Sequence, residues 1–406
     1  MKGKSEGKPL GLSRAEAVRI AYTARFAPTG PGDPGAEVSD GTAQQLERIG
    51  HAQIDTISVV QRAHHHVLWA GDRRYDPACI ARLESGPRRV FEYWAHAAAY
   101  LPIGDYRYCL PRMKRIAETG HEWFPADRRV VDAVLDRIRA EGPLRSCDFE
   151  AGDGPRGPWW DWKPAKAALE YLFMSGVLLV ASRTGFQKLY DLAERVLPPV
   201  LDSRFPSDEE MGDWYVKRTA LAYGVFSEAD VAYMRKDGRA GLSAALSRAE
   251  ESGSLVRVVV DGNESRAAWA SKSALEAVSE GASIEDGRPV RILSPFDNYI
   301  IDRKRTKRLL GFDYTLECYV PQAKRKFGYF ALPVIWNGEP VGLVDAAAER
   351  KTKRLVIKRS LFHFRPDGPM TGLEALKYAP DGFHAAFNDE LSEFAAFNEC
   401  DETEYT

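Results

Sequence analysis

The residues of this chain with the clearest potential for chemistry are Gln53 and Asp55, which are separated by Ile54. The surrounding run over 51–60 mixes β-branched, apolar and polar residues, which predicts a short strand. Residues two apart on a strand point to the same face about 7 Å apart, so an amide and a carboxylate would lie side by side. An ionised aspartate can stabilise a developing positive charge or take a proton from water, and a neighbouring amide can hold that water. The alternative is that both side chains only cap helices or bind loop backbone.

A second group of residues, His64 to His66, suggests a metal site. Consecutive residues on a helix point in different directions, however, and no acidic or sulfur partner stands at ligand spacing. The five cysteines are odd in number, widely spaced and without a Cys-x-x-Cys pair, so neither a disulfide framework nor a zinc ribbon is indicated. We therefore expect chemistry that needs no metal and no organic cofactor.

The elements on either side of this pair are predicted from helix caps and periodicity. Ser13 is a plausible N-cap for a helix over 14–26. A Gly- and Pro-rich stretch over 29–42 indicates a mobile loop. Helices are then expected over 43–49 and over 61–70.

An internal repeat gives the main signal about domain organisation. The pattern from Ala167 to Gly176 (Ala-Ala-Leu, five residues, Ser-Gly) recurs 77 residues later, from Ala244 to Gly253. Each copy predicts a helix that ends on glycine, followed by a strand, a turn and a returning strand. This order is the second half of a winged helix, which presents a recognition helix to the major groove and a hairpin wing to the DNA backbone.

The chain after Ile284 is predicted to be mainly strands. Asn337-Gly338 is a strong hairpin signal, and the strands together predict a small antiparallel sheet or barrel of about a hundred residues. Two helices are expected near the end, over 372–378 and 383–398. The expected strands run over 290–293, 314–320, 328–336, 339–344 and 354–358.

Length and composition exclude several classes of protein. The 406 residues include 56 Lys and Arg against 58 Asp and Glu, and 44% are hydrophobic, which is ordinary for globular domains and argues against disorder. At about 100 to 200 residues each, two to four domains are expected. The apolar stretches are much shorter than the roughly 20 residues of a bilayer span, and the N-terminus lacks the apolar core of a signal peptide. We therefore expect a cytoplasmic protein.

The charged residues are segregated along the chain. The segment 301–330 carries eight Lys or Arg and three acids, whereas 381–406 carries eight acids and no Lys or Arg. A basic face can bind DNA even when the whole chain is near neutral, although a solvated basic surface is an equally good interpretation. The candidate DNA contacts lie in an expected hairpin tip, in a basic helix and beside the Gln53 strand: Lys324, Arg325, Lys326, Arg303, Arg305, Arg62 and His64.

Longer runs of the sequence resemble a known family. The run from Ala52 to His65 and the run from Val90 to Ala98 are similar to the amino-terminal signature of the AlkZ/YcaQ-type winged-helix DNA glycosylases. The segments over 160–198 and 293–314 fit the same family, so the resemblance spans nearly the whole chain. Gln-Ile-Asp over 53–55 matches the Gln-Φ-Asp pattern of the YcaQ branch and departs from the Gln-Φ-Gln pattern of the azinomycin-resistance branch. The loop over 29–42 departs from the family pattern. This departure bears on the fine shape of the expected DNA cleft and not on the chemistry.

The resemblance implies an α+β fold with three tandem winged-helix (helix-turn-helix) domains followed by an antiparallel β-barrel. The expected boundaries are 9–125 for the first winged helix with the catalytic region, 126–204 and 205–286 for the next two, and 287–406 for the barrel and C-terminal helices. The family hydrolyses the N-glycosidic bond of alkylated purines, including N7-alkylguanine and interstrand crosslinks, and leaves an abasic site. Asp55 would then be the catalytic carboxylate and Gln53 the residue that positions water.

The expected protein is thus a monomeric DNA repair glycosylase that needs no cofactor, binds damaged double-stranded DNA and is associated with the nucleoid. The main alternative is a non-enzymatic winged-helix DNA-binding protein or regulator, for which Asp55 would be dispensable. A nuclease is a further alternative, but it would ordinarily use several carboxylates around a divalent metal. The run Tyr93 to His96 is predicted on an apolar helix, chiefly as packing, with His96 as a candidate to face the cleft.

Overall fold

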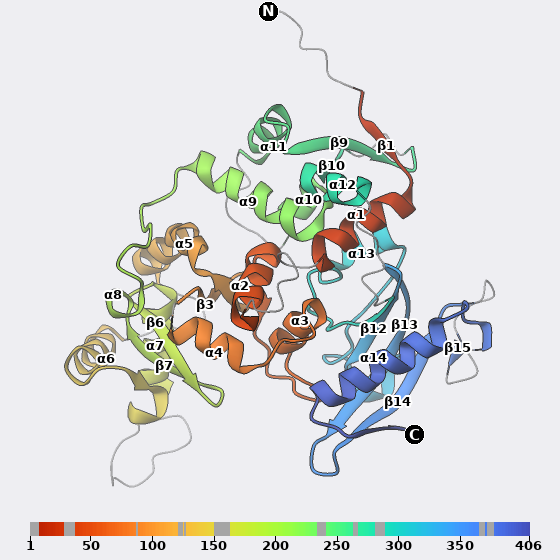
Figure 1. The fold of residues 1–406 in the computed structure, drawn as a ribbon. Helices are drawn as coiled ribbons and strands as arrows, with labels where there is room; N and C mark the ends of the chain where they lie inside the picture. The colour runs from red at the N-terminus through yellow and green to blue at the C-terminus, as the bar shows by residue number, and fades with distance from the viewer. Residues whose placement is uncertain are drawn as a thin grey trace, which may run out of the picture.

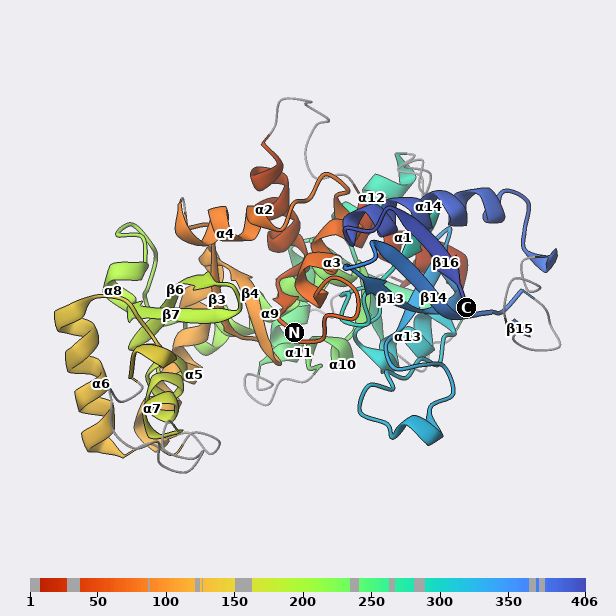
Figure 2. The same cartoon turned by 90° about the horizontal axis from the view of Figure 1, so that it is seen from below.

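The computed structural model describes residues 8–27, 37–86, 88–120, 125, 127–149, 163–233, 241–262, 267–280, 289–364, 370–371 and 377–406. Helices and strands are mixed along the whole chain, as expected for an α+β protein. Three small sheets belong to the part before residue 280, and a larger sheet belongs to the C-terminal part. Figures 1 and 2 show this larger sheet, in blue, at the opposite end of the molecule from α6 and α7.

One order of elements occurs three times before residue 280: a helix, a short strand, two further helical segments and a strand hairpin. The first unit comprises α2 (Val38–Ile49), β2 (Ala52–Gln53), α3 (Ala63–Gly71), α4 (Ala78–Ser85), β3 (Val90–Trp94) and β4 (Ala98–Pro102). The second comprises α6 (Arg128–Glu141), β5 (Leu144–Arg145), η2 (Ser146–Phe149), α7 (Lys163–Met174), β6 (Leu178–Thr184) and β7 (Gln187–Leu192). The third comprises α9 (Asp208–Tyr223), β8 (Val225–Ser227), α10 (Glu228–Val231), α11 (Leu242–Glu251), β9 (Leu255–Val260) and β10 (Ala268–Ser271).

The three units also share a sheet topology. Their strand orders are β2-β4-β3, β5-β7-β6 and β8-β10-β9, so in each unit the short first strand pairs with the last strand. The predicted sequence of helix, glycine, strand, turn and strand is confirmed in the second and third units. Gly176 and Gly253 follow α7 and α11 with φ of 76° and 72°, a conformation that disfavours residues with a Cβ.

The N-terminal segment joins the third unit, although the predicted boundaries group it with the first. β1 (Leu10–Leu12) pairs in parallel with β9 and extends that sheet. The predicted helix over 14–26 is confirmed as α1 (Arg14–Phe26), with a capping box between Ser13 and Glu16. α1 contacts α9, α12 (Lys272–Ser279) and α13 (Arg303–Leu310), so it lies between the third unit and the C-terminal part.

The C-terminal sheet has the order β11-β12-β13-β14-β15, with β16 paired in parallel to β14. Its strands are β11 (Val290–Ile292), β12 (Ala331–Trp336), β13 (Glu339–Glu349), β14 (Arg354–Phe362), β15 (Met370–Thr371) and β16 (Glu402–Tyr405). The predicted hairpin turn at Asn337-Gly338 joins β12 to β13, with φ of 46° and 84°. In the described ranges no pairing joins the two edges, so what is seen there is an open half-barrel.

The predicted C-terminal helix over 383–398 is confirmed as α14 (Phe383–Phe397), which packs across the C-terminal sheet (Figure 1). Residues of α14, of this sheet and of the first unit share one hydrophobic core. The first unit therefore packs directly on the C-terminal sheet. Four further segments connect these elements: η1 (Ile103–Asp105), α5 (Tyr106–Thr119), α8 (Ala193–Val196) and η3 (Gln322–Lys324).

Four predicted elements differ from the structure. The expected helix over 93–96 covers the end of β3 and the start of the β3–β4 turn, and the strand expected over 51–60 is the two-residue β2. The expected strand over 314–320 is irregular, because Glu317 binds backbone N–H groups of its own loop in place of a neighbouring strand. The helix expected over 43–49 begins earlier, at Val38. The predicted loop over 29–42 and helix over 372–378 fall largely outside the described residues.

Candidate active site

Gln53 lies at the end of β2, whose partner strand is β4. The register places Gln53 opposite Ala99, and the N–H of Ile54 donates to the carbonyl of Ala98 at 2.8 Å. The Gln53 side chain is only 9% exposed. Its Oε1 lies 2.9 Å from Nε2 of His96, which belongs to the turn between β3 and β4. The first unit's sheet therefore holds both the backbone and the amide of Gln53.

Asp55 lies just beyond the strand, so the expected strand alternation does not extend to it. Its half-buried carboxylate accepts a hydrogen bond from the N–H of Ile57 through Oδ1 at 2.7 Å. In the described part of the chain, the second oxygen, Oδ2, accepts no hydrogen bond. One carboxylate oxygen is thus fixed by a local turn, while the other remains open to an incoming group.

The segment that follows Asp55 is fastened to the C-terminal part of the chain. The N–H of Ala348 on β13 donates to the carbonyl of Val59 at 2.7 Å, and the N–H of Gln61 donates to Oδ1 of Asn398 at 2.7 Å. Asp55 also lies close enough to the loop before η3 to act on it electrostatically. Burial, and then the negative charge of Asp55, raise the pKa of the Cys318 thiol. The acidic residue therefore lies where the first unit meets the C-terminal sheet.

The loop between α13 and β12, over 311–330, carries the predicted basic turn. Glu317 closes the base of this loop, because its carboxylate accepts hydrogen bonds from the N–H groups of Lys326, Phe327 and Gly328 at 2.7–3.3 Å. Burial alone would raise the pKa of Glu317, but these donors together hold it below its usual value. The loop includes η3 and projects from the sheet as the light-blue segment below α13 in Figure 2.

The three cations of this loop lie at its surface to different degrees. Lys324 and Lys326 are exposed, whereas Arg325 is half-buried and donates from Nε to the carbonyl of Val320 at 2.8 Å. The Arg325 guanidinium also lies over the Tyr329 ring at 4.9 Å. The DNA-binding role of all three residues remains a prediction. The two lysines are exposed to solvent, which such a role requires.

Two of the other predicted DNA contacts, Arg305 and His64, are buried and a third, Arg303, is half-buried, so their predicted contact with DNA stays a prediction. Arg305 is 1% exposed and donates to the carbonyls of Tyr223, Val225 and Tyr299. Arg303 is half-buried and donates to the carbonyls of residues 295 and 300. His64 is 3% exposed, and burial together with nearby positive charge keeps its pKa well below the usual value. A basic helical pattern predicts charge but cannot reveal which face is turned inward.

Arg62 binds an element of the second unit. Its guanidinium lies over the ring of Phe186 at 4.2 Å, and Arg183 approaches the same ring at 4.7 Å. Phe186 belongs to the β6–β7 turn, the tip of the second unit's hairpin. Arg183 also forms a bidentate ion pair with the buried carboxylate of Glu92. Arg62 therefore joins two units, and its predicted contact with DNA stays a prediction.

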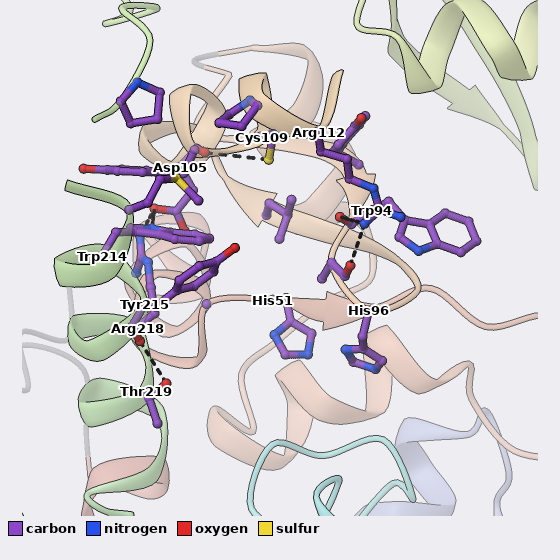
Figure 3. A pocket seen from close by; sticks show the side chains of 18 of the residues that line it. His51, Trp94, His96, Asp105, Cys109, Arg112, Trp214, Tyr215, Arg218 and Thr219 are labelled. Atoms are coloured by element: carbon purple, nitrogen blue, oxygen red, sulfur yellow. Dashed lines mark hydrogen bonds and ion pairs between the residues drawn. The ribbon is translucent and has the colours of Figure 1, made fainter. Parts of the chain in front are cut away.

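A cavity of about 970 Å³ lies beside the Gln53 end of the site. It is bordered by the β3–β4 turn, α5 and α9, and His51 and His96 lie at one end of it (Figure 3). Across it, Asp105 accepts hydrogen bonds from the Trp214 indole at 2.8 Å and from Arg218 at 2.6 Å. His96 lines this cavity and also contacts Gln53, so it connects the two.

With this geometry in view, comparison with known proteins identifies the family. The family model described as DNA glycosylase AlkZ-like matches residues 46–397. The chain belongs to the AlkZ-like DNA glycosylase family. Among solved structures, the Streptomyces sahachiroi DNA glycosylase AlkZ matches 98% of this chain and 100% of its own length, with a TM-score of 0.58 at 15% identity. At that identity the likeness establishes a shared fold.

The family-matched region contains all the predicted site residues, including Gln53 and Asp55. No group of three or more His, Cys, Asp or Glu side chains in the described ranges is arranged to hold a metal ion. His65 and His66 instead form hydrogen bonds within the protein. Nδ1 of His65 lies 2.8 Å from the Tyr75 hydroxyl, and Nε2 of His66 lies 2.9 Å from the Ile292 carbonyl. None of the helices that the structure describes is long and apolar enough to cross a membrane.

Sequence reasoning on this AlkZ-like glycosylase named His96 as a candidate to face the cleft but missed its contact with Gln53, and it missed the contact of Phe186 with Arg62. His96 was expected on a helix, where its distance from Gln53 could not be inferred. A sequence signal that could have placed His96 in a turn is the run of aromatic and small residues on either side of Ala95, which is compatible with a strand hairpin. Phe186 lies in the turn of an expected hairpin, but its contact with Arg62 joins residues more than a hundred positions apart.

Proposed function

We propose that this protein hydrolyses the N-glycosidic bond of N7-alkylated guanine in double-stranded DNA and leaves an abasic site. Asp55 stabilises the oxocarbenium-like sugar and activates water, and Gln53 positions that water. The observation that carries this proposal is the Asp55 carboxylate, fixed through one oxygen by the N–H of Ile57 and open at the other, beside a basic loop. The family of the chain supports the glycosylase reaction itself.

A single carboxylate is sufficient for this substrate. Alkylation at N7 gives guanine a positive charge, so the base leaves as a neutral molecule and no general acid has to protonate it. The developing charge is on the sugar, where an anionic oxygen stabilises it, and the same carboxylate can take the proton of the attacking water. The partly desolvated position of Asp55 strengthens this electrostatic effect.

We further propose that the substrates include interstrand crosslinks, which the enzyme unhooks. A base tied to the opposite strand cannot rotate out of the duplex into a closed pocket, so the carboxylate must reach the sugar from an open groove. The position of Asp55 supports this proposal, because its half-buried carboxylate lies near the loop before η3 and is not among the residues that line the cavity beside Gln53.

The three repeated units suit duplex DNA if each is a winged helix, as we propose with boundaries at about 126, 205 and 287. Each unit has the strand hairpin of a wing and a helix before it, and the shared strand orders support a common architecture. The loop over 311–330, with Lys324 and Lys326 exposed, then contacts phosphates or the minor groove.

The deciding experiment uses end-labelled duplexes with one N7-alkylguanine or one nitrogen-mustard crosslink, incubated in EDTA and then treated with hot alkali. Wild type should produce strand breaks at the modified guanine only after alkali, which is the mark of a monofunctional glycosylase. Asp55→Asn should lower the rate by at least about 100-fold while DNA binding persists. If wild type binds both duplexes but leaves them intact, the glycosylase proposal is wrong and the protein is a non-enzymatic DNA-binding protein.

A further inference from the structure

We infer that His96 is a positioning residue that sets the orientation of the Gln53 side-chain amide. This inference rests on the proposed role of Gln53. The two side chains meet through Nε2 of His96 and Oε1 of Gln53 at 2.9 Å, a normal hydrogen-bond length. Gln53 ends β2 and His96 lies in the turn between β3 and β4, so the contact is made only when the β3–β4 hairpin and β2 are both in place.

The chemistry of the two groups fixes the direction of this bond. An amide oxygen carries no hydrogen, so Nε2 of His96 donates and Oε1 of Gln53 accepts. The neutral tautomer with a proton on Nε2 and the doubly protonated ring both provide this donor. With Oε1 held, the N–H donors of the amide point away from His96.

This orientation serves the proposed reaction. A Gln53 N–H can donate to the oxygen of the attacking water while Asp55 accepts one of its protons. The remaining lone pair of that oxygen attacks the sugar carbon, and the electrons of the broken bond pass to the cationic base, which leaves neutral. A freely rotating amide would present its oxygen to the water in part of the population, so fixing it increases the reactive fraction.

The position of His96 is itself fixed by its surroundings. The turn that carries it is closed by the N–H of Ala95 and the carbonyl of Ala97 at 2.9 Å, and Arg112 on α5 donates to the carbonyl of Ala95 at 3.1 Å. The His51 ring stands nearly perpendicular to the His96 ring, with centroids 5.0 Å apart (Figure 3). The imidazole is thus supported by backbone, by α5 and by a neighbouring ring.

The test compares substitutions that keep or remove the donor. His96→Phe keeps a ring without the N–H, and His96→Leu is a second donor-free variant in case the phenyl ring does not fit. His96→Gln places a side-chain N–H near the position of Nε2. In single-turnover assays on the N7-alkylguanine duplex, both donor-free variants should lose about tenfold in rate, with DNA affinity unchanged and His96→Gln close to wild type. His384→Phe, on the exposed face of α14, is the matched control and should leave the rate unchanged.

A double-mutant cycle separates positioning from a direct role. If His96 acts through Gln53, then adding His96→Phe to Gln53→Ala should cause no further loss. Full multiplication of the two losses, an equal loss in His96→Gln and His96→Phe, or a loss confined to DNA affinity would each overturn the inference. If Gln53→Ala and Asp55→Asn are both fully active, the proposed function of the site fails and the inference fails with it. If they are impaired while His96→Phe is fully active, only the inference fails.

Discussion

The arginines of this protein separate into those that fasten its interior and those that face solvent. Arg25 and Asp297 form a bidentate ion pair in which both side chains are fully buried, and it links α1 to the segment before α13. Arg305 binds three carbonyls between the third unit and α13. Buried guanidinium groups of this kind satisfy backbone acceptors that would otherwise be desolvated without a partner. These buried arginines therefore join elements of the fold, a role that does not depend on DNA.

This division predicts very different effects on stability for two cations that the sequence analysis placed together as candidate DNA contacts. Arg305→Met should destabilise the fold by about 3–5 kcal/mol, because it leaves buried carbonyls without donors. Lys324→Ala should change the free energy of unfolding by less than about 0.5 kcal/mol, since its side chain is exposed. Urea denaturation measures both, and equal stability of the two variants would contradict the buried placement of Arg305.

At the scale of elements, α3 shows how the fold holds three adjacent histidines neutral. His66 is fully buried, and burial lowers its pKa from 6.5 to about 4. Burial likewise lowers the pKa of His65 to about 4 and that of His64 well below its usual value. In the unfolded chain these residues return to ordinary pKa values, so the unfolded state binds more protons between pH 4 and 6.5. Stability should therefore fall as the pH drops through that window.

The measurable consequence concerns proton uptake on unfolding. His66→Gln keeps a donor for the Ile292 carbonyl but removes one titrating group, so the slope of stability against pH between about pH 6 and pH 5 should fall by nearly one proton. His384→Gln, on the exposed face of α14, is the control and should leave the slope as it is. Denaturant unfolding at a series of pH values gives the slopes, and an unchanged slope in His66→Gln would show that His66 is already protonated in the folded state.

Local signals predicted the elements well where one residue decides the conformation. Ser13 caps α1, Gly176 and Gly253 end their helices, and Asn337-Gly338 forms its turn, as the sequence indicates. The β3–β4 hairpin escaped prediction because its turn depends on pairing between strands and not on turn residues. Gln53 and Asp55 could be singled out from the sequence, but their surroundings could not, since His96 and Cys318 reach them through long-range packing.

For the molecule as a whole, the net charge of −2 conceals exposed cations on one projecting loop. Lys324 and Lys326 lie on the loop that Glu317 closes, near Asp55. If both contact phosphates, binding releases counterions and the affinity falls with salt. Net charge and total composition cannot predict where these exposed cations lie. The loop that carries them is held by hydrogen bonds from its own backbone to Glu317 and not by a repeating pattern.

The salt dependence of binding tests this arrangement. Replacing Lys324 and Lys326 together by alanine should reduce the slope of log affinity against log salt by about two, one for each phosphate contact, at any DNA sequence. The paired control is Lys304→Ala with Lys307→Ala, two cations of α13, which should change the slope less if the loop is the principal contact. Fluorescence anisotropy over a salt series gives both slopes, and equal reductions would assign the DNA contact to a broader basic surface.

The attachment of the N-terminal segment has a consequence for the order in which the protein is made. β1 and α1 are synthesised before the third unit, yet β1 pairs with β9, and the N–H of Arg14 donates to a carboxylate oxygen of Asp261, 247 residues later in the chain. β1 must therefore wait for its partner until β9 has left the ribosome. Contacts of such long sequence separation form slowly. The third unit's sheet is thus completed only after β9 has been translated, and the strand that completes it is the one that precedes all its other strands in the sequence.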